Sequence, residues 1–129
     1  MNTEEKVAYW LDIAQYDLET AKSIQQSGRY VYTVFMCQQA VEKLLKALYL
    51  KKYEKEAPRS HSLVYLEGLL NLKLDEPQRE LLAELTSYYI EGRYPTYKQK
   101  TSQLVNEAKA NELLKKTLET FIWLSSQIK

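Results

Sequence analysis

The chain has 129 residues, a length that fits one domain with its own hydrophobic core. It contains only 3 Gly and 3 Pro, too few for the frequent turns of a β-sandwich or barrel, so the composition favours long helices. Lys and Arg total 18 against 17 Asp and Glu, which argues against a basic nucleic-acid-binding surface spread over the whole chain.

Cysteine and apolar content narrow the class of protein further. Cys37 is the single cysteine, so the chain cannot form an intramolecular disulfide. No signal peptide pattern and no apolar run of about 20 residues is present, so we expect a cytoplasmic protein with no membrane contact. One histidine and one cysteine cannot supply the three or four ligands of a zinc site, and we expect neither metal nor cofactor.

Apolar residues at spacings of three and four predict a first helix over about residues 4–27. Asn2 or Thr3 can cap its start, and Gly28 can end it. A second helix is predicted from residue 29 or 30 to residue 52 or 53. Because the link between the two helices is short, we expect them to form an antiparallel hairpin.

The chain reverses after the second helix, in a charged segment that contains Pro58. Ser60 or Ser62 can cap a shorter third helix. Asp75 and Gln78 form a capping-box pattern that starts a fourth helix.

Gly92 and Pro95 are expected to end the fourth helix near residue 91. A last helix is predicted from a start between residues 102 and 106 to residue 128. The expected fold is all-α: a five-helix up-and-down bundle with four long helices and a shorter third, in one domain spanning residues 1–129.

The second predicted helix carries polar residues whose role needs an explanation. Gln38 lies on its apolar stripe and needs a hydrogen-bonding partner, which we expect to be a polar contact between helices. Glu42 and Lys46 are spaced i,i+4 and are predicted to form a solvated surface pair without chemical function.

His61 stands at the start of the third helix as the only histidine of the chain. Histidine is suited to proton transfer near neutral pH, but a lone histidine at a helix start is more often a local hydrogen-bonding residue. The position alone favours the second interpretation.

Arg93 follows the apolar fourth helix between Gly92 and a proline-fixed turn. Its planar guanidinium suits phosphate or carboxylate recognition, Lys98 adds a second cation, and aromatic rings nearby can stack on a base. These rings belong to Tyr89, Tyr94 and Tyr97. The alternative is a positively charged helix end sealed by tyrosines, and the residues alone favour neither.

Four segments in chain order carry a combined pattern: Asp17–Ala21, Gln38–Ala47, Ser60–Leu63, and Tyr88–Tyr89 with Arg93–Pro95. Together they resemble the HEPN family, the higher eukaryotes and prokaryotes nucleotide-binding domain, over nearly the whole chain. The resemblance implies a helical bundle that often forms a homodimer. It also implies an association with a minimal nucleotidyltransferase in toxin–antitoxin or defence systems.

Many HEPN proteins are metal-independent ribonucleases that use an Arg, four to six further residues, and a His. Here Lys98, Gln99 and Lys100 occupy the positions where that histidine falls. The only histidine, His61, lies 32 residues before Arg93. Cleavage by 2′-hydroxyl attack would therefore require His61 to approach Arg93 in space.

Three functions remain open. The first is a module that binds a nucleotide, an RNA or a nucleotidyltransferase partner. The second is a metal-independent endoribonuclease toxin that uses Arg93 with His61 or with a group of a partner chain. The third is a structural dimerisation bundle. A subsidiary expectation is that Tyr94 or Tyr97 accepts a nucleotide from a partner transferase.

Overall fold

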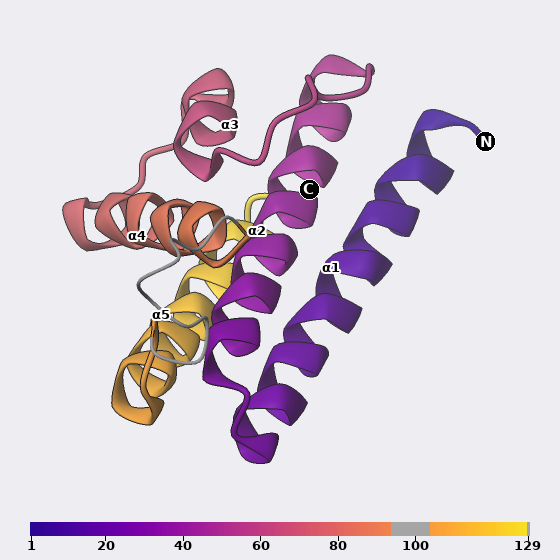
Figure 1. The fold of residues 1–129 in the computed structure, drawn as a ribbon. Helices are drawn as coiled ribbons and strands as arrows, with labels where there is room; N and C mark the ends of the chain where they lie inside the picture. Colours follow the sequence, from indigo (N-terminus) through magenta and orange to yellow (C-terminus); the bar gives the residue numbers. More distant parts are fainter. Residues whose placement is uncertain (94–103, 129) are drawn as a thin grey trace.

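The computed structural model describes residues 1–93 and 104–128, and these residues form an all-helical bundle (Figure 1). Its helices in chain order are α1 (Thr3–Ser27), α2 (Tyr30–Tyr53), α3 (Leu63–Leu70), α4 (Glu76–Arg93) and α5 (Glu107–Ser125). The described residues contain no strand. The predicted all-α bundle of five helices with a short third helix is confirmed.

Most helix ends follow the predicted capping residues. The Asn2 side chain accepts a hydrogen bond from the Glu5 backbone at the start of α1, and Gly28 ends that helix in the left-handed conformation at φ 83°. Ser62, rather than Ser60, is the N-cap of α3. Asp75 and Gln78 form the reciprocal bonds of a capping box, with lengths of 2.8 and 2.9 Å.

Two helix ends differ from the prediction. Helix α4 continues through Gly92 to Arg93 instead of ending near residue 91. A glycine inside a helix costs only about 1 kcal/mol, which is too little to end the helix at Gly92. Helix α5 ends at Ser125, and residues up to Ile128 continue in tighter i→i+3 turns.

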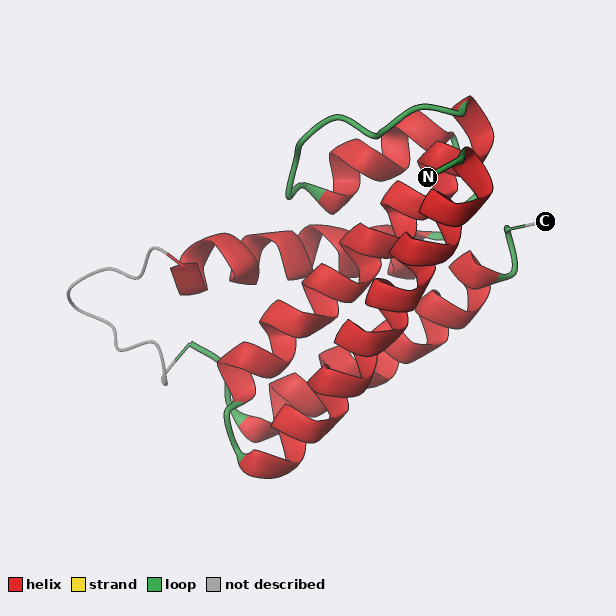
Figure 2. Cartoon of the chain, turned by 90° about the vertical axis from the view of Figure 1, so that its right-hand side faces the viewer, coloured by secondary structure: helices red, strands yellow, loops and turns green. Residues whose placement is uncertain are grey.

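Helix α2 is the centre of the bundle. It packs against each of the other four helices, with α1 antiparallel to it along one side and α5 on another (Figures 1 and 2). Helix α4 crosses α2 obliquely in both views. The fully buried leucines of the described residues come from four helices: Leu44, Leu45, Leu50, Leu63, Leu66, Leu82, Leu85, Leu113 and Leu124.

The central position of α2 leaves it little surface for polar residues. A helix surrounded by other elements must be apolar on most sides, and its polar residues need partners inside the protein. Three polar side chains of α2 are buried: Thr33, Gln38 and Glu42.

No helix in the described part of the chain is both long and apolar enough to span a membrane.

Candidate functional site: a buried carboxylate beneath the histidine

Gln38 and Glu42 lie one helical turn apart on α2 and face the loop that precedes α3. Gln38 donates from Nε2 to the His61 backbone carbonyl at 2.8 Å and to Glu42 Oε1 at 3.1 Å. Both side chains are fully buried. Gln38 Oε1 accepts from Gln39 Nε2 at 2.7 Å. The partners of Gln38 are therefore a loop carbonyl and two side chains of its own helix, not a second helix as the sequence predicted.

Glu42 has four hydrogen-bonding or ionic partners. Its Oε1 accepts from Gln38 and from His61 Nδ1, the latter at 2.9 Å, and its Oε2 lies 3.1 Å from Lys46 Nζ and 3.7 Å from Lys43 Nζ. Burial alone raises the pKa of Glu42, but the bonds from His61, Gln38 and Lys46 outweigh it and hold the pKa below the usual value. Glu42 is thus a carboxylate kept ionised inside the protein.

The prediction that Glu42 and Lys46 form a solvated surface pair is wrong about their solvent exposure. The ion pair forms, but the Glu42 side chain is only 1% exposed and the Lys46 side chain 16%. The spacing along the helix was sufficient to predict the contact. It could not show that α2 has no solvated face at this position.

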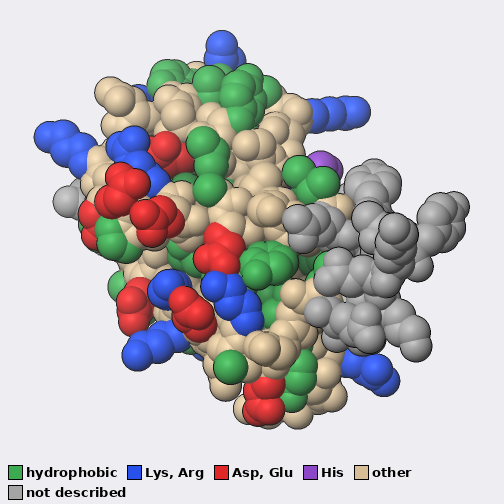
Figure 3. All heavy atoms as spheres, turned by 60° about the vertical axis from the view of Figure 1, so that its left-hand side comes forward, with side chains coloured by type: hydrophobic (Ala, Val, Ile, Leu, Met, Phe, Trp, Pro, Cys, Tyr) green, Lys and Arg blue, Asp and Glu red, His purple; other side chains and the backbone are tan. Residues whose placement is uncertain are grey.

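His61 presents a partly open imidazole above this carboxylate. Its side chain is 56% exposed, and the histidine is visible at the surface in Figure 3. Donation from Nδ1 to Glu42 leaves Nε2 as the acceptor nitrogen of the neutral ring. An imidazole oriented by a buried carboxylate in this way can accept a proton or a hydrogen bond at Nε2. The partner of His61 is 19 residues away, so its bonding is not the local kind favoured from sequence.

Helix α4 brings the predicted arginine position to the same end of the bundle. The rings of His61 and Tyr89 lie 5.3 Å apart between centroids. Arg93 follows Tyr89 by four residues on α4, so its backbone lies about one helical turn further along the same face. The Arg93 backbone therefore lies about one helical turn from Tyr89, whose ring contacts His61.

Several predicted site residues lie outside the described part of the chain. Tyr94, Tyr97 and Lys98 belong to the segment between residues 93 and 104, and the description of Arg93 stops at its backbone. Tyr89 is only 8% exposed and packs its edge against Phe35 at 5.8 Å. Its ring therefore supports the wall behind His61 and offers no open face for a stacked base.

In the part of the chain that the structure describes, neither a reactive cysteine nor a cluster of metal ligands adds to this site. Cys37 is fully buried, and burial raises the pKa of its thiol to about 12, which keeps the sulfur protonated and unreactive. Among the described residues, no three His, Cys, Asp or Glu side chains converge as metal ligands. On the face shown in Figure 3, acidic and basic side chains are interspersed.

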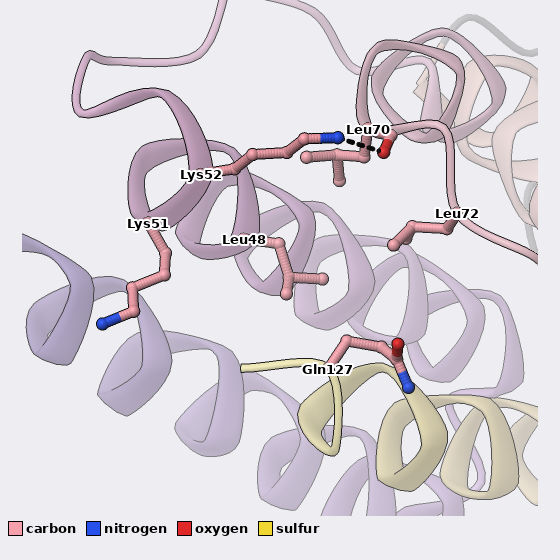
Figure 4. A pocket seen from close by; sticks show the side chains of 6 residues that line it. All are labelled: Leu48, Lys51, Lys52, Leu70, Leu72 and Gln127. Carbon is pink, nitrogen blue, oxygen red and sulfur yellow. Dashed lines mark hydrogen bonds between the residues drawn. The ribbon is translucent and has the colours of Figure 1, made fainter. Parts of the chain in front are cut away.

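A separate hollow of 320 Å³ lies between α2, α3 and the end of the chain (Figure 4). Its lining comprises Leu48, Lys51, Lys52, Leu70, Leu72 and Gln127. Lys52 Nζ donates to the Leu70 carbonyl at 2.9 Å, where a lysine satisfies the open end of α3. This hollow shares no lining residue with the Glu42–His61 site, and we attribute its polar contact to helix capping.

The sequence also matches a known protein family. The model of the HEPN domain matches residues 7–126, nearly the whole chain. The chain belongs to the HEPN domain family. The predicted resemblance is thereby confirmed. No curated protein matches the sequence of this HEPN domain.

Solved structures similar to this HEPN domain include three that match it over almost their whole length. TT1696 from Thermus thermophilus has a TM-score of 0.81 at 23% identity, with 98% of this chain and 99% of that chain covered. ST0689, an archaeal HEPN homologue, has a TM-score of 0.78 at 26% identity, with 95% of this chain and 98% of that chain covered. The HEPN domain protein tm0613 from Thermotoga maritima has a TM-score of 0.70 at 22% identity, with 92% of this chain and 95% of that chain covered. These similarities support the fold.

Proposed function

We propose that this HEPN domain binds a ribonucleotide unit of RNA between His61 and Arg93. The observation that carries the proposal is the 2.9 Å bond from His61 Nδ1 to the buried Glu42 carboxylate. That bond directs the acceptor nitrogen Nε2 of the neutral imidazole away from the core. A neutral Nε2 matches a hydroxyl donor, and a guanidinium matches a phosphate. A ribonucleotide carries both groups.

The single histidine provides a direct binding assay. The imidazole resonances of His61 are unique in the NMR spectrum of the chain, because no other histidine contributes. We expect the ribodinucleotide ApA to shift them saturably and its 2′-deoxy counterpart to shift them less. Arg93→Ala should abolish the shift, whereas Arg79→Ala on the same helix should not. An ApA-induced shift that is absent, or unchanged in Arg93→Ala, contradicts the proposal.

A second candidate function, metal-independent RNA cleavage, is favoured by the same carboxylate–imidazole pair. His61 Nε2 would take the proton of a ribose 2′-hydroxyl as its oxygen attacks phosphorus. The P–O5′ bond would break to leave a 2′,3′-cyclic phosphate, with Arg93 neutralising the charge of the phosphorane. A proton for the leaving 5′ oxygen would come from a group of a partner chain in a homodimer.

Product analysis separates cleavage from binding. Incubation of RNA with the protein and EDTA should yield 2′,3′-cyclic phosphate ends, and His61→Ala and Arg93→Ala should each abolish them. Cleavage that persists in Arg93→Ala, or no cleavage by the wild-type protein, contradicts the ribonuclease function. Binding of ApA without cleavage would leave the first proposal standing alone.

We also propose that the domain acts as a homodimer and with a minimal nucleotidyltransferase, as its family resemblance suggests. Support on the surface comes from large side chains of α1 and α5: Tyr9, Tyr16 and Ile122 are 53, 74 and 72% exposed. Light scattering should give twice the chain mass of 15.2 kDa at micromolar concentration. Co-purification with the product of a neighbouring nucleotidyltransferase gene tests the second partner.

A further inference from the structure

A second hollow, of 360 Å³, lies where α1, α2 and the loop between α2 and α3 come together. Its lining consists of Trp10, Lys46, Glu56, Ala57 and Arg59. The volume falls at the lower end of the range of small-molecule sites, about 300 to 1,000 Å³. Three of its five lining residues are charged, and the largest apolar surface is the Trp10 indole.

Basic side chains gather around the indole of this hollow. Lys43 Nζ and Lys46 Nζ each lie 5.8 Å from the centre of the Trp10 ring. Their side chains are only 20% and 16% exposed, so water screens them less than it screens ordinary surface lysines. Both ammonium groups approach the same oxygen of Glu42, at 3.7 and 3.1 Å. One carboxylate oxygen therefore serves two cations.

The remaining charges do not neutralise this cluster. Lys6 lies 3.7 Å from Glu56 and offsets it. Asp17 interacts with Lys43 and contributes one negative charge. Arg59 is exposed and has no hydrogen-bond or ion-pair partner among the residues that the structure describes. The hollow thus keeps an excess of positive charge, which includes an unpaired guanidinium.

We propose that this hollow binds a small phosphate monoester, with Arg59 and Lys46 on the phosphate and the Trp10 indole against the organic group. A guanidinium holds two phosphate oxygens through its planar fork, and a lysine adds a point charge. The site uses residues other than His61 and Arg93. It stands independently of ribonucleotide binding at those two residues.

The fluorescence of Trp10 tests the proposal. Trp10 and Trp123 are the only tryptophans, so Trp123→Phe leaves Trp10 as the single reporter. Phenyl phosphate is the probe, because it has a flat ring and a phosphate monoester but no ribose. We expect it to change the fluorescence saturably, with phenol and inorganic sulfate much less effective. Calorimetric titration of the wild-type chain gives the same comparison if Trp123→Phe does not fold.

A matched pair of arginine variants locates the contact. Arg59→Ala should weaken phenyl phosphate binding about tenfold, the effect of losing one charge-assisted phosphate contact. Arg29→Ala removes an exposed arginine at the other end of α2 and should leave binding unchanged. Equal effects of the two variants, equal binding of sulfate and phenyl phosphate, or no saturable response at millimolar concentration would overturn the proposal. Unchanged phenyl phosphate binding in Arg93→Ala separates this site from the ribonucleotide site.

Discussion

Two glutamates of this chain each stand four residues before a lysine with which they pair, one at the centre of the bundle and one on its surface. Glu42 lies 3.1 Å from Lys46, and Glu112 lies 2.8 Å from Lys116. Their side chains are 1% and 46% exposed. Helical spacing determines which side chains meet, whereas packing determines the energetic value of their contact.

The partners of the two carboxylates differ accordingly. Glu42 is bonded by Gln38 and by His61 of a distant loop, so its charge joins α2 to the entrance of α3. Within the described residues, the Glu112 carboxylate pairs with two lysines of its own helix, Lys109 and Lys116. Removal of the Glu42 side chain should therefore leave buried partners unsatisfied, whereas removal of the Glu112 side chain breaks only screened surface ion pairs.

The largest expected effect is the loss of the buried carboxylate. Glu42→Ala should lower the free energy of unfolding by about 3 kcal/mol, because it leaves the buried Gln38 amide and the partly buried Lys46 and His61 without their acceptor. Glu112→Ala should leave it unchanged within error. Urea denaturation measures both variants. Equal stabilities of the two variants would show that the Glu42 network does not hold the loop to α2.

A second matched pair compares two glutamines that each bond a glutamate four residues later. Gln38 donates to Glu42 at 3.1 Å inside the protein, and Gln15 donates to Glu19 at 2.9 Å on the surface. Gln38→Ala should cost about 2 kcal/mol, because the His61 carbonyl also loses its donor. Gln15→Ala should be neutral in the same denaturation experiment. A neutral Gln38→Ala would contradict the importance of the loop contact.

The pH dependence of stability gives a smaller effect that tests the same carboxylate. The pKa of Glu42 is lowered in the folded protein, so its contribution is complete above the ordinary glutamate value of 4.5 and is lost as the pH falls through the lower folded value. Glu42→Gln removes this titration and should flatten the acidic limb of stability against pH. Stability curves of wild type and Glu42→Gln that run parallel below pH 4.5 would contradict the assigned pKa direction.

Local signals in the sequence were sufficient to predict the helices. Asn2, Gly28, Ser62 and the Asp75–Gln78 capping box each act through bonds to residues at most four positions away, so their roles follow from spacing alone. Gly92 was misjudged because a modest helix penalty was treated as a stop.

The candidate site depended on long-range packing and was only partly predictable. His61 and the Arg93 position were predicted as site residues, but Glu42, which orients His61, was interpreted as a surface residue. Its signal was present in the sequence: Gln38 and Glu42 follow one another at i,i+4 on a helix with apolar residues on most sides. Only the arrangement of the other four helices around α2 shows that this face is buried.

The tautomer of His61 tests the central claim most directly, since the proposed site requires Glu42 to hold Nδ1–H and leave Nε2 open. Long-range proton–nitrogen NMR correlation distinguishes the two nitrogens of this single histidine at a pH where the ring is neutral. We predict that the proton resides on Nδ1 in the wild-type protein. A proton on Nε2 would contradict the Glu42–His61 bond and the acceptor role that the proposed function assigns to Nε2.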